Sequence, residues 1–125
     1  MNNKIETSIY LMPGMAASPK IFEFIKFTSN YKIVYLKWIK PNTNESIKSY
    51  AKRMLVFITD VDPVLIGVSF GGILVQEISK HVKVKKLIII SSVKSKVELS
   101  LSMKFAKKTG LHRFLPLNWI NDLEK

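Results

Sequence analysis

Four short apolar runs alternate with segments of helical periodicity in this sequence, and this alternation restricts the fold more than any other feature. The runs are Thr7–Met12, Tyr31–Trp38, Val64–Val68 and Lys86–Ser91. They are almost continuously apolar, as is typical of parallel strands that are buried on both faces. Parallel strands need a crossover connection, which is usually a helix. The sequence therefore predicts an α/β fold, with a parallel sheet of about four strands and helices on both faces.

Apolar residues at helical spacing lie between the predicted strands. The clearest stripe follows the second run and consists of Ile47, Tyr50, Ala51, Met54, Leu55 and Ile58. A second stripe follows the third run and consists of Leu74, Val75, Ile78 and Val82. Both stripes have the spacing of an amphipathic helix that covers a core. A shorter helix is expected after Ser18-Pro19, a capping serine followed by proline at the first helical position.

The length and composition indicate one domain. The chain has 125 residues, 47% of them hydrophobic, which is enough for a sizeable core and excludes a disordered chain. We expect residues 1–93 to form the core and residues 94–125 to form a lid-like or partly ordered tail. Within the tail, the apolar residues of 97–105 alternate as in a strand but fit a helix nearly as well, so both alternatives stay open.

The net charge of +11 is the most unusual feature of the composition. The excess is almost entirely lysine, since Arg53 and Arg113 are the only arginines. Proteins that read base edges favour arginine, whose planar fork pairs with guanine. We therefore expect no nucleic-acid partner and at most a weak association with anionic surfaces.

Cysteine is absent and only two histidines are present, so the sequence predicts neither a disulfide framework nor a metal site. We also expect no cofactor. No apolar run approaches the ~18 residues that cross a bilayer, so no transmembrane segment is expected. Nothing in the sequence requires an oxidising compartment, and a cytoplasmic protein is expected.

The stretch VLIGVSFGGILVQE, Val64 to Glu77, leads a predicted strand directly into a predicted helix. Gly67, Ser69 and Gly71 give it the form G-x-S-x-G. A sharp turn of this kind strains the serine backbone, so the residues two positions away must lack clashing side chains. The turn would present the Ser69 hydroxyl beside the first amides of a helix. Ser69 is therefore the candidate catalytic nucleophile, and an ordinary turn serine is the competing interpretation.

Two backbone N–H groups are candidates for an oxyanion hole. The Phe70 amide opens the predicted helix, and the Met15 amide follows the Pro13-Gly14 turn after the first strand. Gly14 would keep the approach to that amide clear. Both segments leave the carboxyl ends of strands, where ligands bind in open α/β sheets. The glycine patterns of nucleotide-binding loops are absent, which favours acyl chemistry over phosphate binding.

Together these segments resemble the front half of the α/β-hydrolase fold. LMPGMAAS is similar to the strand and oxyanion loop, LIGVSFGG to the nucleophile elbow, and KLIIISS to the next strand, so that the resemblance covers Ser8 to Ser92. It implies that the first strand lies between the second and third, with the fourth beyond. It also implies that Ser69 attacks an ester, thioester or amide carbonyl. The single Gly14 before Met15 is similar to esterase- or lipase-like members, and the tail would be the start of a lid.

The acid and the histidine of a triad cannot be identified, although the family carries them in that order after the serine. His81 lies twelve residues beyond the serine along a helix, about 18 Å away, and is expected to interact with the helix-end carbonyls. His112 precedes Asp122, which is the reverse order. Asp60 and Asp62 precede the third strand, at the opposite edge of the sheet, and are expected to be turn residues.

Three explanations remain open. The chain is an incomplete hydrolase, truncated before the last strands and with little activity alone; or His112 folds back as the base; or the scaffold serves without hydrolysis. The first explanation predicts an exposed edge strand at Lys86–Ser91. The function expected from the sequence is hydrolysis of a small carboxylic ester or related acyl compound. The alternative is a non-catalytic basic α/β domain that binds anionic lipid or nucleic acid.

Overall fold

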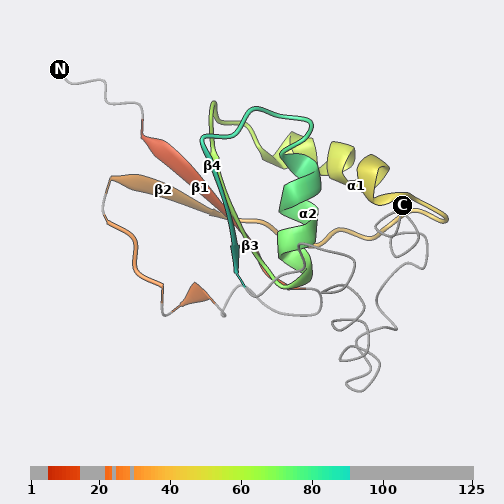
Figure 1. Ribbon diagram of the computed structural model, residues 1–125, viewed down its shortest axis with the longest axis horizontal. Coiled ribbons are helices and arrows are strands. Elements are labelled where there is room, and N and C mark those ends of the chain that lie inside the picture. Colours follow the sequence, from red (N-terminus) through yellow and green to blue (C-terminus); the bar gives the residue numbers. More distant parts are fainter. Residues whose placement is uncertain (1–5, 15–21, 24, 29, 91–125) are drawn as a thin grey trace.

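The computed structural model describes residues 6–14, 22–23, 25–28 and 30–90 (Figure 1). The elements in chain order are β1 (Thr7–Met12), β2 (Tyr31–Tyr35), α1 (Ile47–Met54), the 3-10 turn η2 (Leu55–Phe57), β3 (Val64–Val68), α2 (Phe70–Ile78) and β4 (Lys86–Ile90). The four strands form a sheet in the order β2-β1-β3-β4, and every pair is parallel. The α/β fold with a four-stranded parallel sheet is confirmed, and so is the position of the first strand between the second and third.

β1 lies inside the sheet and is buried along almost its whole length. It pairs with β2 from Thr7 and with β3 from Ile9. Tyr10 and Met12 belong to the core on one face, while Ile9 and Leu11 belong to the core on the other. A strand covered on both faces has no position for a polar side chain facing water, which explains why the residues from 9 to 12 are all apolar or aromatic.

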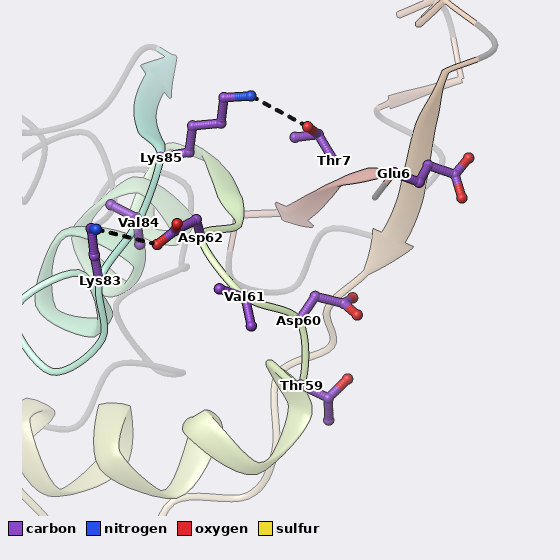
Figure 2. A pocket seen from close by; sticks show the side chains of 9 residues that line it. All are labelled: Glu6, Thr7, Thr59, Asp60, Val61, Asp62, Lys83, Val84 and Lys85. Carbon is purple, nitrogen blue, oxygen red and sulfur yellow. Dashed lines mark hydrogen bonds and ion pairs between the residues drawn. The ribbon is translucent and has the colours of Figure 1, made fainter. Parts of the chain in front are cut away.

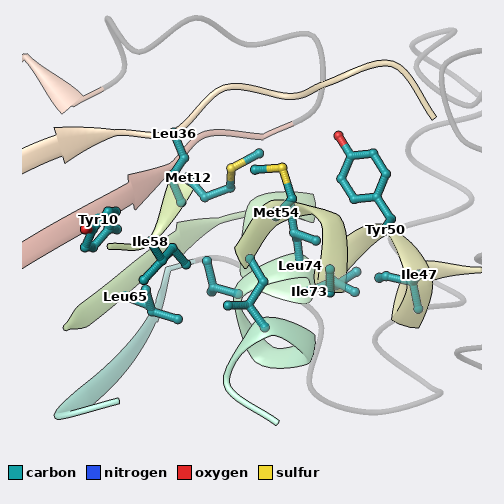
Figure 3. Close-up of a cluster of buried hydrophobic side chains, with 13 residues drawn as sticks. Tyr10, Met12, Leu36, Ile47, Tyr50, Met54, Ile58, Leu65, Ile73 and Leu74 are labelled. Atoms are coloured by element: carbon teal, nitrogen blue, oxygen red, sulfur yellow. The ribbon is translucent and has the colours of Figure 1, made fainter. Parts of the chain in front are cut away.

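Both described helices pack on the same face of the sheet (Figure 1). Figure 3 shows the core that they enclose, where side chains of α1, α2, β1 and β3 meet. Four residues of the predicted α1 stripe are buried, namely Ile47, Tyr50, Ala51 and Met54. On the opposite face, Phe22 packs with apolar residues of β1 and β3. Most of the short helix expected after Ser18-Pro19 falls outside the described residues.

Two elements end earlier than the sequence predicts. β2 stops at Tyr35 instead of Trp38, and the Trp38 indole N–H donates to the Pro13 carbonyl at 3.0 Å. α2 stops at Ile78, so Val82 packs against the core from outside the helix. The alternation at 97–105 and the lid-like tail at 94–125 also lie outside the described residues.

β4 is an edge strand of the described sheet, as expected for this segment. Its two ends, Lys86 and Ile90, are exposed and its middle is half-buried. None of the helices within the described ranges has the length and apolar character needed to cross a membrane.

Candidate active site

Ser69 occupies the corner between β3 and α2. Its φ of 55° and ψ of −123° lie in a region that residues with a side chain rarely adopt, at a cost of about 1–3 kcal/mol. The corner is held by its backbone: Ser69 N–H donates to the Ile90 carbonyl at 3.1 Å, and Gly72 N–H donates to the Ser69 carbonyl at 2.9 Å. Residue 69 is exposed, and its side chain makes no capping hydrogen bond to α2. The strained backbone therefore presents the hydroxyl at the molecular surface.

The two glycines around the corner are required for space. A Cβ added at Gly67 would lie 2.4 Å from the Gly71 carbonyl oxygen. One added at Gly71 would lie 2.4 Å from the Met12 carbonyl oxygen and 2.5 Å from that of Pro13. Real Cβ atoms do not approach backbone this closely. Gly67 thus allows α2 to fold back on β3, and Gly71 allows α2 to touch the end of β1.

Gly14 lies directly against the corner. A Cβ added at Gly14 would be 3.4 Å from the Ser69 Cβ and 3.9 Å from its Oγ. Gly14 after β1 and the corner after β3 therefore lie side by side at the carboxyl edge of the sheet. Phe70 is the first residue of α2, in the turn whose N–H groups have no partner within the helix. Met15, the other candidate oxyanion donor, lies outside the described residues, and its role stays a prediction.

An ion pair that the sequence did not indicate supports the segment between β2 and α1. Arg53 donates two hydrogen bonds to the Glu45 carboxylate, from Nε to Oε2 at 2.7 Å and from Nη2 to Oε1 at 2.8 Å. The Glu45 side chain is only 3% exposed. The hydrogen bond from Arg53 lowers the pKa of Glu45 and outweighs the opposing effect of burial. No local sequence signal marks this pair, since the partners are eight positions apart.

His81 is not near Ser69. Its backbone N–H donates to the Ile78 carbonyl at 2.9 Å, as expected of a residue at a helix end, and its Nε2 lies 3.4 Å from Glu77 Oε1. The nine residues of α2, about 14 Å of helix, separate it from the corner. His81 therefore cannot act as the base for this serine. His112 and Asp122 lie outside the described residues.

Asp60 has a larger structural role than the turn residue expected from the sequence. Its Oδ2 accepts hydrogen bonds from Ser8 Oγ and Tyr10 Oη, both at 2.8 Å, and from Lys32 Nζ at 3.3 Å. These donors, led by Tyr10, lower the pKa of Asp60. The carboxylate thus connects the turn before β3 to β1 and β2.

A charged cleft of about 800 Å³ lies at the amino ends of the strands (Figure 2). It is lined by Glu6, Thr7, Thr59, Asp60, Val61, Asp62, Lys83, Val84 and Lys85. Figure 2 shows the Lys83 ammonium 4.0 Å from an Asp62 carboxylate oxygen, and Lys85 Nζ donating to the Thr7 hydroxyl at 3.3 Å. The cleft contains neither Ser69 nor the glycines around it, which lie at the opposite edge of the sheet.

Within the part of the chain that the structure describes, no group of three or more His, Cys, Asp or Glu side chains could hold a metal ion. No known family model matches this sequence, and a comparison with curated proteins finds no match either. The functional interpretation therefore depends on the geometry of the corner and its surroundings.

Proposed function

We propose that this protein is a serine hydrolase of the α/β-hydrolase type, acting on a small carboxylic ester or a related acyl compound. The observation that carries the proposal is the conformation of Ser69: an exposed serine with φ of 55°, placed between a strand and a helix and facing Gly14 of the neighbouring loop. Strain of this size persists where the surrounding structure enforces it, and such residues cluster at functional sites.

In the proposed reaction, Ser69 Oγ forms a bond to the acyl carbon while the carbonyl electrons move onto oxygen. The amides of Phe70 and Met15 stabilise that oxyanion. The C–O bond to the leaving group then breaks, and the serine proton passes through a base to the departing alcohol. Water attacks the acyl-serine, releases the acid and restores the hydroxyl. The base is not assigned, because His81 lies at the wrong end of α2.

A fluorophosphonate probe tests the proposal, because serine attack on phosphorus with loss of fluoride requires the same activated hydroxyl as attack on an acyl carbon. We expect covalent labelling of the full chain at Ser69, located by peptide mass spectrometry, and no labelling of Ser69→Ala. Ser79→Ala is the matched control, since Ser79 lies at the other end of the same helix and bonds the Gln76 carbonyl. A wild-type chain that stays unlabelled, or a label on another residue, refutes the proposal.

The net charge of +11 favours one other candidate, a non-catalytic basic domain that binds anionic lipid or nucleic acid. That function predicts binding to anionic vesicles or to a polyanion that weakens steeply as salt is raised. Such binding, with no labelling of the serine, would replace the hydrolase proposal.

A further inference from the structure

The loop that touches Ser69 is held from the side of β2 by one side chain. Trp38 Nε1–H donates to the Pro13 carbonyl at 3.0 Å, across 25 positions of sequence. The Pro13 side chain is fully buried. The same carbonyl oxygen packs against α2 where Gly71 leaves room, since a Cβ there would lie 2.5 Å away. Pro13 is thus fixed between an indole on one element and the first turn of a helix on another.

The next residue, Gly14, faces Ser69, since a Cβ added at Gly14 would lie 3.4 Å from the Ser69 Cβ. The peptide that joins Pro13 to Gly14 is planar, so an interaction that sets its carbonyl also sets the direction in which the chain continues. The hydrogen bond from Trp38 thus acts on the carbonyl one residue before the glycine that faces Ser69.

Trp38 is itself held in place by α1. Its ring packs against the buried Tyr50 ring, with centroids 6.0 Å apart. The Tyr50 hydroxyl donates to the Ile39 carbonyl at 2.7 Å and accepts from the Ile39 N–H at 2.8 Å, so it pairs both backbone groups of the residue after Trp38. Arg53 lies over the Tyr50 ring at 5.4 Å and donates to the Lys40 carbonyl at 2.9 Å. Three consecutive residues are therefore tied to one helix.

The Glu45–Arg53 ion pair holds the Arg53 side chain that lies over the Tyr50 ring. Withdrawing a carboxylate from water carries a large desolvation cost, and buried ion pairs are weak sources of stability compared with apolar packing. What the pair provides is a fixed geometry, because Arg53 simultaneously contacts Glu45, the Tyr50 ring and the Lys40 carbonyl. The arrangement has the form of a rigid second layer behind a site.

We propose that Trp38 is a positioning residue: its indole N–H, braced by Tyr50 and Arg53, sets the Pro13-Gly14 loop beside Ser69 and so supports the geometry in which the serine reacts. This inference rests on the proposed hydrolase function. It assigns Trp38 no contact with substrate.

The test replaces Trp38 by phenylalanine, which keeps an aromatic ring against Tyr50 and removes the N–H donor. Fluorophosphonate labelling is followed over time at several probe concentrations, to separate the maximal labelling rate from the probe concentration that gives half of it. We expect the maximal rate to fall about tenfold, the size expected for one lost hydrogen bond that acts on the reacting geometry. The half-saturating concentration should change little, because initial probe binding does not use the oxyanion amides.

Tyr10→Phe is the matched control. It also removes hydrogen bonds of a buried aromatic residue, in this case those to Asp60 at the opposite edge of the sheet. We expect it to lower Tm and to leave the labelling rate unchanged. If both variants slow labelling in proportion to their loss of Tm, Trp38 has only a structural role and the inference is wrong.

The two proposals fail in different ways. A wild-type chain that does not label refutes the hydrolase function and with it the role of Trp38. If Trp38→Phe labels at Ser69 as fast as the wild type, the proposed hydrolase function stands and only the positioning role of Trp38 is refuted.

Discussion

The strain at Ser69 can be measured as a stability difference between two substitutions. Ser69→Ala removes the hydroxyl and keeps the Cβ that makes φ of 55° unfavourable, whereas Ser69→Gly removes the Cβ as well. Relief of the strain is worth about 1–3 kcal/mol. Glycine also gains freedom in the unfolded chain, which offsets about 0.5–1 kcal/mol of that relief. We therefore expect Ser69→Gly to be more stable than Ser69→Ala by about 1 kcal/mol, and its Tm to be higher by about 4 °C.

The comparison is clean because little else changes. Residue 69 is exposed, so neither substitution opens a cavity, and its two backbone hydrogen bonds, to Ile90 and from Gly72, are available to any residue. Urea unfolding followed by circular dichroism gives the free energy of unfolding of each variant, and differential scanning calorimetry gives Tm. A Ser69→Gly variant that is no more stable than Ser69→Ala would show that the corner is unstrained, and the main argument for a nucleophile would be lost.

Further predictions concern the glycines and Asp60. Gly71→Ala should lower the free energy of unfolding by about 1–3 kcal/mol, since the added Cβ would lie 2.4 Å from a backbone oxygen. Gly14→Ala should keep Tm but slow phosphonate labelling, since its Cβ would lie 3.9 Å from the serine Oγ. An unfolded Gly14→Ala variant, or a Gly71→Ala variant of unchanged stability, contradicts this reasoning. The lowered pKa of Asp60 contributes stability that is present above the ordinary pKa of 3.8 and is lost as pH falls through the lower pKa of the folded state. In Asp60→Asn, the free energy of unfolding measured with urea should therefore depend less on pH in that range. An unchanged pH dependence contradicts this prediction.

The sequence predicts the fold well because each strand is both apolar and bounded by turn residues. Thr7–Met12 and Val64–Val68 are predicted with the bounds that the structure has. The position of the serine corner is also predictable, since a buried strand leads directly into a helix and the glycines at 67 and 71 leave space for the sharp turn. The catalytic roles of these residues stay predictions.

The supporting layer could not be predicted, because its contacts join residues far apart in sequence. Trp38 looks like a continuation of the β2 strand, and only the tertiary fold brings its indole to Pro13. Tyr50 looks like an ordinary member of an apolar stripe, and nothing local shows that its hydroxyl bonds Ile39. Asp60 looks like an ordinary turn residue in the sequence, and only the tertiary structure shows that Ser8 and Tyr10 of β1 donate hydrogen bonds to its carboxylate.

The position of β1 inside the sheet has a consequence for biosynthesis. One partner, β2, is made early, since Thr7 pairs with Tyr31, but the partner on β3 is made 55 positions later, from residue 9 to residue 64. At a synthesis rate of about 5–20 residues per second, the wait is about 3–11 seconds. During that interval β1 has only one of its two neighbouring strands, so its backbone edge toward β3 stays unpaired on the nascent chain.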